Sequence, residues 1–419
     1  MDVCFCLPAR GHTMSRRGSD RSHCIRKTAL RPSDRSTSAE PAIIEKLHED
    51  YMKPGVLSLA AGVSYMKPPR DCLSWALEAV LQSDSADPHR YGDVVGDQNL
   101  LEVIRRKLET VNKLTGQEIM VTAGANQAFV NVLLSITDVG DEVILTKPYY
   151  FSHLVALQLC GVVPVMANSD PELKPDPIEI KASITPKTKA LVLVNPGNPS
   201  GSVAERELVE ELETLCHDAG IWLISDEAYE HFLYNSVAHY SPSLYPNQVI
   251  NIFTMSKSYA LAGWRVGYIS YPKILSDSML KINDTVPTHA CRTSQSIATK
   301  ALEDDGDFPA VHAKELERNR DEIWRVVEKY ATVKTTGAFY FFIKAPGGYD
   351  DLDATRILAE KYNVLVVPGV AFGMPGYLRI SYAGLRYEVM KTAAACLEEG
   401  LLYLSRIPPE REDAKERWD

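Results

Sequence analysis

The feature that most constrains the fold is a regular alternation of short apolar runs with helical periodicity, which begins near Thr115. In the segment 205–217, Leu208, Leu212 and Leu215 recur at spacings of four and three residues, which is typical of a buried helix face. The apolar runs are of strand length and lie at 119–122, 142–146, 162–165, 190–194, 221–225 and 249–253. Strands that alternate with helices predict an α/β fold, in which a mostly parallel sheet carries helices on both faces.

The chain is also long enough for a second, smaller domain, since its 419 residues far exceed the ~150 expected of one domain. A helical pattern at 310–329 and apolar runs at 338–343 and 364–367 predict an α+β unit, which the run at 57–60 could join. We therefore expect an extension at 1–40, an N-terminal arm with part of the small domain at 41–85, a large domain at 86–295, a small C-terminal domain at 296–408 and a tail at 409–419.

The first 40 residues differ from the rest, because seven arginines are interspersed with serines and no apolar face recurs. This composition is typical of an organelle transit peptide, for a plastid or a mitochondrion, although Asp2, Asp20 and Asp34 weigh against one. The alternative is a disordered extension of a cytoplasmic protein, with Met14 as another start site. We take the cytoplasm as the expectation and keep the organelle as the alternative.

Charge and composition exclude several classes of function. The 45 basic and 55 acidic residues give 45 − 55 = −10, which disfavours general nucleic-acid binding. No apolar run approaches the ~18 residues of a membrane span, so no membrane partner is expected. The eight cysteines are scattered, and the close pair Cys4 and Cys6 has no second pair to complete a zinc site. We expect reduced thiols and no metal.

Residues able to do chemistry follow the predicted strands, at the edge where parallel strands bind ligands. The loop Asn-Pro-Gly-Asn-Pro-Ser-Gly at 195–201 is rigid enough to aim an amide at a ligand, although it could simply connect two elements. Asp226 follows the next run and needs a cation or donors if buried, unless it caps a helix. Tyr229, three residues on, would share its face.

The last predicted strand is followed by two cationic residues. Lys257 lies in Thr-Met-Ser-Lys-Ser at 254–258, and a lysine desolvated there would have a lowered pKa and act as a nucleophilic amine. Its alternative is an ordinary surface lysine. Arg265 offers a planar fork for a phosphate, or else a structural salt bridge.

Two earlier strand ends add an anion site and an aromatic ring. Gly124, Ala125 and Asn126 open a predicted helix, whose free N–H groups could bind a phosphate. Tyr150, in Pro-Tyr-Tyr at 148–150, offers an aromatic face, although such rings usually pack in a core. A phosphate site, a ring, an amide, a carboxylate and a reactive lysine at successive strand ends suit a phosphorylated aromatic aldehyde.

With these motifs in order, the chain resembles the class I/II aminotransferases of fold type I, which depend on pyridoxal 5′-phosphate. The resemblance covers about 42–405 and rests on Asn-Pro-x-Asn-Pro-Ser-Gly, Asp-x-x-Tyr, Ser-Lys and Gly-x-Arg-x-Gly. It implies an aspartate aminotransferase-like fold with a seven-stranded-type sheet in a large cofactor-binding domain. It also implies a homodimer with shared active sites.

The family's residue roles pass to this chain where its motifs match. Lys257 resembles the lysine that forms the Schiff base, and Asp226 resembles the partner of the pyridine nitrogen. Asn198 and Tyr229 resemble the donors to the phenolic oxygen, and Tyr150 resembles the stacking ring. The phosphate site is matched by Gly124, Ala125, Asn126, Thr254, Ser256 and Arg265.

Three further matches concern the substrate and the neighbouring subunit. Tyr91, in Arg-Tyr-Gly-Asp at 90–93, matches a tyrosine that reaches the phosphate of the other subunit. Arg379, in Gly-Tyr-Leu-Arg-Ile-Ser at 376–381, matches the arginine that binds the substrate's α-carboxylate. Asn198 and the backbone of Gly62 match the groups that assist it.

The resemblance implies ping-pong transfer of an amino group between an L-amino acid and a 2-oxo acid. Dicarboxylate-specific relatives carry an arginine that the segment 281–287 lacks, and Arg292 is a doubtful substitute. Similarity to plant-type aromatic aminotransferases favours phenylalanine, tyrosine, tryptophan or methionine. An aspartate or broad-specificity aminotransferase and a C–S β-lyase remain alternatives. A catalytically inactive relative is a further alternative, whereas a transcriptional regulator would need a DNA-binding domain, for which the extension is too short.

Overall fold

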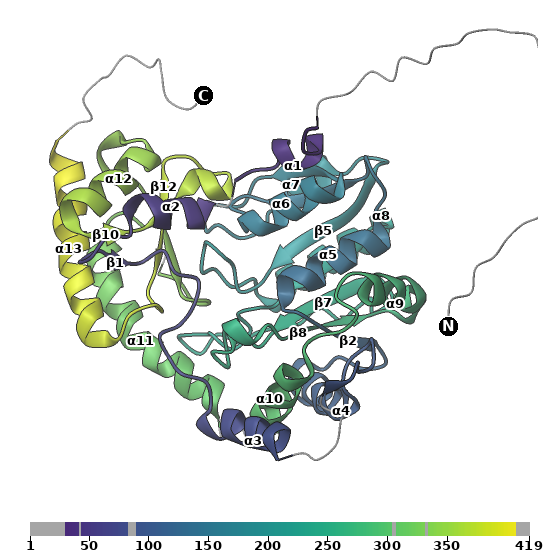
Figure 1. Cartoon of the computed structure of the whole chain (residues 1–419). Helices are drawn as coiled ribbons and strands as arrows, with labels where there is room; N and C mark the ends of the chain where they lie inside the picture. Colours follow the sequence, from purple (N-terminus) through teal and green to yellow (C-terminus); the bar gives the residue numbers. More distant parts are fainter. Residues whose placement is uncertain (1–29, 42, 83–88, 304–306, 332–333, 408–419) are drawn as a thin grey trace, which may run out of the picture.

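The larger body of the protein is built on a twisted sheet (Figure 1). The computed structural model describes residues 30–41, 43–82, 89–303, 307–331 and 334–407, and within them this sheet has seven strands in the order β2-β8-β7-β6-β5-β3-β4. Its strands are β2 (Glu118–Thr122), β3 (Glu142–Thr146), β4 (Val163–Ala167), β5 (Thr188–Val194), β6 (Trp222–Asp226), β7 (Val249–Thr254) and β8 (Gly267–Tyr271). The strand β8 runs antiparallel to both of its neighbours, and the other strands all point the same way, so the predicted mostly parallel sheet is confirmed.

Each of the six predicted apolar runs forms a strand of this sheet, but the sequence did not predict β8. Its residues Gly-Tyr-Ile-Ser-Tyr are all buried, although a glycine and a serine interrupt their hydrophobicity. Ser270 is satisfied by donating its hydroxyl hydrogen to Gln117. A polar residue with a buried partner hides a core strand from any search for apolar runs.

Helices cover both faces of the sheet because alternate strand residues point to opposite sides. One face packs on α5 (Ala125–Ile136), α6 (Phe151–Cys160) and α9 (Ser276–Thr285). The other packs on α7 (Pro177–Ser183) and α8 (Arg206–Ala219), the helix predicted at 205–217. Beside β2, β7 and β8 lies a third cluster that holds α3 (Arg70–Leu81), α4 (Gln98–Lys107) and α10 (Arg292–Glu303). This cluster crosses the predicted domain boundaries at 85 and 295.

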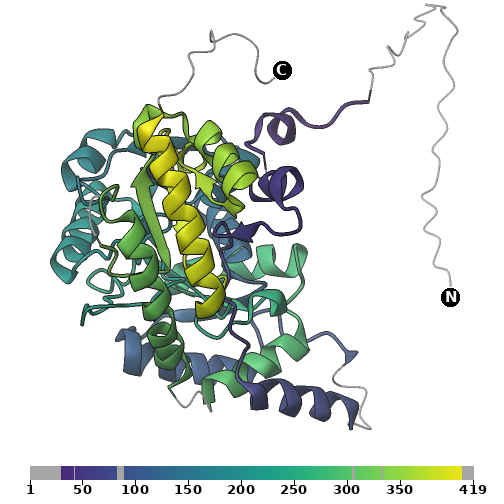
Figure 2. The same ribbon diagram turned by 90° about the vertical axis from the view of Figure 1, so that its left-hand side faces the viewer.

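The smaller body joins the two flanks of the chain. Leu57–Ser58 (β1) pairs in parallel with Val364–Leu365 (β10), so a strand from each flank meets there. An antiparallel sheet of order β11-β12-β9 is formed by β9 (Tyr340–Lys344), β11 (Val367–Pro368) and β12 (Tyr377–Ser381). Figure 2 shows its long helix in front, where α13 (Tyr387–Arg406) packs with α11 (Phe308–Val327) and α12 (Asp351–Tyr362). The helix α2 (Ile43–Tyr51) lies beside α12.

The strand β12 was also missed by the sequence analysis, because the buried cation Arg379 interrupts its apolar residues. Near the N-terminus, a short helix α1 (Asp34–Ser38) lies within the segment expected to be an extension, and Glu40 N–H donates to Gln158 Oε1 on α6 at 2.9 Å. The arginine-rich stretch on which the compartment prediction rests lies mostly at 1–29, outside the described residues, as does the tail at 409–419. In the described part of the chain, no helix is both long and apolar enough to cross a bilayer.

Candidate active site

The predicted site residues gather at one edge of the large sheet. They line one pocket, which is formed by Ala125, Asn126, Tyr150, Val194, Asn198, Asp226, Ala228, Tyr229, Thr254, Ser256, Lys257 and Arg265. Every cofactor-binding residue predicted from the sequence is in this lining except Gly124 and Tyr91. Successive strands therefore deliver their polar ends to one point, as the sheet topology predicts.

The antiparallel strand β8 does not disturb this convergence. Thr122 at the end of β2 and Thr254 at the end of β7 are both paired with Gly267 at the start of β8. A Cβ on Gly267 would lie 2.8 Å from the carbonyl carbon of Gly124 and 3.0 Å from the nitrogen of Ala125. Glycine is required at position 267 because any side chain there would push the turn at 123–126 away from β7, the strand that precedes Lys257.

Lys257 has the environment of a reactive amine. Its Nζ donates to the carbonyl oxygen of Gly62 at 2.7 Å, across from the smaller body. Burial, together with the nearby cations Arg379 and Arg265 and against the opposing effect of Asp226, lowers the pKa of Lys257 to about 8. Because the neutral amine is accessible near that pH, it can act as a nucleophile or a base.

Asp226 lies at the end of β6 and is held by two donors. Its Oδ1 accepts from the N–H of Ala228 at 3.1 Å, and its Oδ2 lies 3.1 Å from Nε2 of His153. The segment after β6 is a turn, so the helix-capping alternative does not apply. His153 was missed by the sequence analysis, although a buried polar residue on an apolar helix three positions after Tyr150 is a recognisable signal. Its ring packs on Phe129 with a centroid distance of 4.1 Å.

A second group of hydrogen bonds joins the pocket to the smaller body. Asn198 Nδ2 lies 3.4 Å from the Tyr229 hydroxyl, which is 2.8 Å from the hydroxyl of Tyr340. Burial raises the pKa of Tyr229 well above 10 and that of Tyr340 to about 12. Both phenols therefore stay protonated at neutral pH and can donate to an oxygen ligand. Tyr340 comes from β9, which follows the pocket strands by many residues, so no strand-end pattern identifies it.

Arg379 completes this group as a buried cation with donors to spare. Its side chain is 2% exposed, and it donates to Asn198 Oδ1 at 3.0 Å and to the Ala60 carbonyl at 2.7 Å. Its Nε has no hydrogen-bond partner among the described residues. The guanidinium carbon lies 4.4 Å from the ring centroid of Tyr340 and 5.0 Å from that of Phe372. A buried guanidinium with an open donor favours an incoming carboxylate.

The opposite end of the pocket is suited to a phosphate. The N-terminal turn of α5 opens there, at Ala125 and Asn126. Gly124 has φ +85°, and a Cβ on it would lie 2.5 Å from Arg265 Nη2, so the arginine packs directly on the turn. The hydroxyls of Thr254 and Ser256 lie 2.9 Å apart in the same lining.

The remaining predicted residues are placed differently. Gly62 faces the pocket from the smaller body, where an added Cβ would lie 3.4 Å from the Tyr340 hydroxyl. Tyr91 does not line the pocket of its own chain, is 85% exposed, and contacts His289 edge-on. Of the two loop asparagines, only Asn198 reaches the pocket. Asn195 closes the loop instead, because its side-chain amide pairs with both the N–H and the carbonyl of Ala204.

Comparison with known proteins identifies the family. The family model for aminotransferases of class I and II matches residues 54–397. The chain belongs to the class I and II aminotransferases. It is 37% identical over 359 residues to an aromatic aminotransferase of Arabidopsis thaliana, ISS1, covering 82% of this chain and 89% of that protein. It is 34% identical to an aspartate aminotransferase of Pyrococcus abyssi, with 88% and 98% covered.

Solved structures of aminotransferases share the fold. The aromatic aminotransferase of Pyrococcus horikoshii has a TM-score of 0.78 at 32% identity, with 86% of this chain and 99% of that chain covered. The aspartate aminotransferase of Thermus thermophilus with maleate has a TM-score of 0.83 at 29% identity, with 89% and 100% covered. The expected aspartate aminotransferase-like, fold type I architecture is thereby confirmed, as is transamination between amino acids and 2-oxo acids as the family's reaction.

Class I and II aminotransferases use pyridoxal 5′-phosphate, and the donor set of this pocket fits it. The α5 turn with Arg265 matches the phosphate in charge, and Tyr150 offers a ring face for the pyridine. Asp226 supplies a carboxylate for the pyridine nitrogen, and Asn198 and Tyr229 supply donors for the phenolic oxygen. Lys257 supplies the amine for the aldehyde. The pocket thus has a chemically matched partner for each polar group of this cofactor.

Proposed function

We propose that this aminotransferase exchanges amino groups between aromatic or other apolar L-amino acids, including methionine, and 2-oxo acids by a ping-pong mechanism. Bound pyridoxal 5′-phosphate supplies an aldehyde that takes up the amino group and a ring that accepts electron density from the substrate's Cα. The chain's own residues bind the substrate, orient it and move its protons. The observation that carries the proposal is Lys257, a partly buried amine with a pKa of about 8 that lines the same pocket as Asp226.

Arg379 and Lys257 divide the work on the substrate. Arg379 binds the α-carboxylate through its guanidinium, which Asn198 Oδ1 and the Ala60 carbonyl hold in place. Lys257 Nζ, as the neutral amine, would remove the proton from Cα and deliver it to the carbon that carried the cofactor's aldehyde. The backbone carbonyl oxygen of Gly62 lies 2.7 Å from that nitrogen, so this hydrogen bond orients the amine whenever it is not bonded to the cofactor.

Substitution of Lys257 tests these roles. Lys257→Ala should lose the visible absorbance of the lysine-bound cofactor and the transamination activity together. Asp226→Ala should retain part of the cofactor but lose rate by several orders of magnitude. Near-normal turnover by Lys257→Ala would overturn the assignment of this pocket as the active site.

The set of cationic side chains in the pocket lining supports a substrate with an apolar side chain. A dicarboxylate needs a further cation beside the one that binds its α-carboxylate. In the described lining, the basic side chains are Lys257 and Arg265, whose proposed partners are the aldehyde and the phosphate. Arg292 lies outside the lining of its own chain and next to the segment of Tyr91, with its Nη1 3.4 Å from the Arg90 carbonyl, so it could reach a site only in a second copy. The aromatic aminotransferase ISS1 of Arabidopsis thaliana, at 37% identity, supports the same preference.

A panel of amino donors tests the substrate. Phenylalanine, tyrosine, tryptophan and methionine should each give a higher kcat/KM than aspartate, with a 2-oxo acid as acceptor. Equal or better turnover with aspartate and 2-oxoglutarate would overturn the aromatic assignment and leave the transaminase intact. Release of pyruvate from a cysteine conjugate without an acceptor would instead indicate a β-lyase.

We also propose that the enzyme works as a homodimer with shared active sites. Tyr91 supports this because its side chain is 85% exposed and outside the pocket of its own chain, so it is accessible to a second copy. Light scattering should give twice the 46.6 kDa of one chain. A fully active monomer would contradict the proposal.

A further inference from the structure

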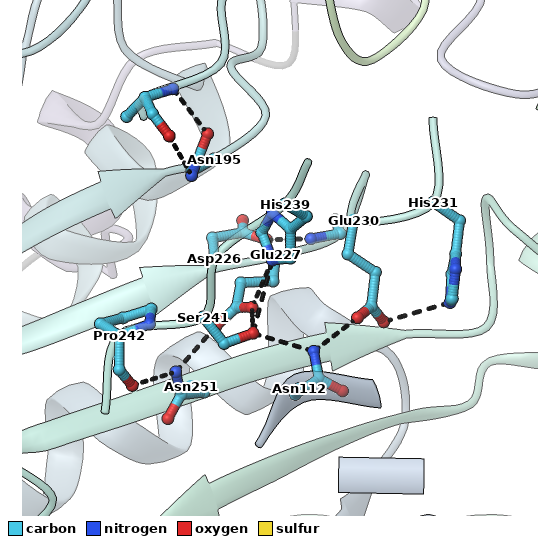
Figure 3. A network of polar contacts seen from close by, with 12 residues as sticks. Asn112, Asn195, Asp226, Glu227, Glu230, His231, His239, Ser241, Pro242 and Asn251 are labelled. Atoms are coloured by element: carbon cyan, nitrogen blue, oxygen red, sulfur yellow. Dashed lines mark hydrogen bonds and ion pairs between the residues drawn. The ribbon is translucent and has the colours of Figure 1, made fainter. Parts of the chain in front are cut away.

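The turn that carries Asp226 and Tyr229 has a second, buried polar face. Asp226, Ala228 and Tyr229 line the pocket, whereas the carboxylates of Glu227 and Glu230 contact a separate polar network. Glu227 is 1% exposed and Glu230 is 8% exposed. Figure 3 shows both side chains within a network of polar contacts beside β6 and β7. Removing two carboxylates from water costs free energy, so their hydrogen-bond and ion-pair partners must offset this desolvation cost.

Glu230 is paired with a cation from α4. Lys107 Nζ lies 2.6 Å from both carboxylate oxygens, and Asn112 Nδ2 donates to Oε2 at 2.8 Å. Burial alone would raise the pKa of Glu230, but Lys107, together with His231 and His239, lowers it to about 2. Lys107 is the last residue of α4, and Asn112 ends the π-helical turn η2 (Leu108–Asn112) that follows it. The Glu230 carboxylate therefore ties the turn to this helical segment.

Glu227 is tied to the sheet and to the loop after the turn. Asn251 Nδ2 on β7 donates to its Oε1 at 2.8 Å, and His239 Nε2 lies 2.6 Å from Oε2. The Ser241 hydroxyl donates to the same Oε2. The hydroxyl oxygen of Ser241 also accepts from Asn112 Nδ2 at 2.8 Å, which connects the two carboxylates into one network.

A cation is a poor alternative occupant of this cluster. Ligand atoms of Glu227, Glu230 and His239 lie within 4.8 Å of one another, a spacing that could hold a metal ion. All four carboxylate oxygens nevertheless already contact protein donors, and Lys107 supplies a positive charge. A metal would have to displace these donors and approach an ammonium group. The carboxylates of Glu227 and Glu230 are therefore satisfied by protein donors without an ion.

We propose that Glu230 and Glu227 are positioning residues, which hold Tyr229 and Asp226 at the geometry that the cofactor requires. Glu230 directly follows Tyr229, and Glu227 directly follows Asp226, so each anchor lies one residue from the side chain that it fixes. The backbone bond from Glu230 N–H to the Glu227 carbonyl, 3.0 Å long, closes the turn between the two anchors. This inference rests on the proposed function, since it assigns Tyr229 and Asp226 to the cofactor's ring.

Removal of both charges of the Lys107–Glu230 pair tests the proposal in the holoenzyme. The double variant Lys107→Met with Glu230→Gln removes both charges of the pair together, so neither partner is left as an unpaired buried charge, and the variant should fold and bind cofactor. A turn with one anchor weakened should let the Tyr229 hydroxyl drift from the phenolic oxygen. The midpoint of the pH titration of the bound cofactor's visible absorbance should then move to higher pH, and kcat should fall up to about 100-fold with little change in KM.

A buried carboxylate away from the pocket provides the matched control. Glu213 on α8 is 1% exposed and accepts from the backbone N–H of Leu244 at 2.6 Å. Glu213→Gln should leave the absorbance titration and kcat unchanged, whatever its effect on the urea midpoint of unfolding. A purely structural role for Lys107 and Glu230 predicts this same pattern for the double variant, and that result would overturn the proposal.

Two further outcomes remain decisive. If the double variant does not fold, Ser241→Ala removes the hydroxyl that links the two carboxylates. A wild-type titration midpoint and kcat in Ser241→Ala would then overturn the proposal, whereas a smaller shift to higher pH would support it. Failure of the proposed function is distinguishable, because turnover by Lys257→Ala would reveal it whatever the network variants do.

Discussion

The substitution Gly267→Ala tests how tightly β8 holds the phosphate end of the pocket. The added Cβ would lie 2.8 Å from both the carbonyl carbon of Gly124 and the carbonyl oxygen of Phe253, whereas ordinary contact begins at 3.4 Å. The backbone must therefore yield by 3.4 − 2.8 = 0.6 Å at a place where no flexible side chain can move aside. Overpacking of this kind costs about 1–3 kcal/mol.

The strain should appear in both stability and cofactor binding. The urea midpoint of the cofactor-free protein should fall, because β2 and β7 are forced apart from β8. The cofactor should bind more weakly by about tenfold, the equivalent of ~1.4 kcal/mol, if that much of the strain is relieved by displacing the turn at 123–126. Equilibrium titration with pyridoxal 5′-phosphate, followed by absorbance, measures the affinity directly.

A matched control is available in the short 3-10 helix η3 (Ala262–Trp264) that precedes β8. Gly263 has no heavy atom within 4 Å of an added Cβ and does not need a positive φ. Gly263→Ala should therefore retain the urea midpoint and the cofactor affinity of the wild type. If Gly267→Ala also behaved like the wild type in both measurements, the close approach of β8 to the phosphate turn would not constrain the site, and our reasoning would be refuted.

Two further substitutions probe the cations of the pocket. Burial lowers the pKa of Lys257 to about 8, so the cofactor-free native state binds fewer protons than the unfolded state between about pH 8 and 10.5, and its stability should rise with pH across that range. At pH 7, Lys257→Met should therefore be more stable than the cofactor-free wild type by at most ~3 kcal/mol, and this difference should shrink above pH 8. Urea unfolding at several pH values measures the difference. A difference that grows with pH would contradict the burial argument. Arg379→Met should raise KM for the amino donor by at least about tenfold through loss of a charged hydrogen bond, with cofactor affinity retained, and an unchanged KM would remove Arg379 from substrate binding.

The sequence predicts most of the large sheet because its strands are simple apolar runs that end in polar residues. Asp226 and Lys257 are recognisable for that reason, since each is the first chemically active side chain after a buried strand. The sequence analysis fails where function or hydrogen bonding places a polar residue inside a strand. Arg379 divides β12 and Ser270 divides β8, so both strands lose the hydrophobic pattern that defines the others.

Long-range partners are the other class of residue that sequence reasoning cannot find. Tyr340 meets Tyr229 over 111 residues of chain, and Lys107 meets Glu230 over 123. Neither pair shares an element or a local spacing, so only the folded topology brings its members together. The second buried face of the turn at 227–230 is invisible for the same reason. Its glutamates appear in the sequence as ordinary charged residues.

The site's dependence on both bodies follows from the contacts between them. Within one chain, the proposed phosphate end is built from the larger body alone. The amine and the arginine proposed to bind the carboxylate each meet the other body: Lys257 at the Gly62 carbonyl, Arg379 at Asn198. The phosphate end can therefore form without a precise fit between the bodies, but the substrate end cannot. Because Arg379 already donates to Asn198 and Ala60 and keeps Nε open, an arriving α-carboxylate must bind at Nε or replace one of these acceptors. With Arg379 in its proposed role, substrate binding and the alignment of the two bodies would be coupled through a single buried guanidinium.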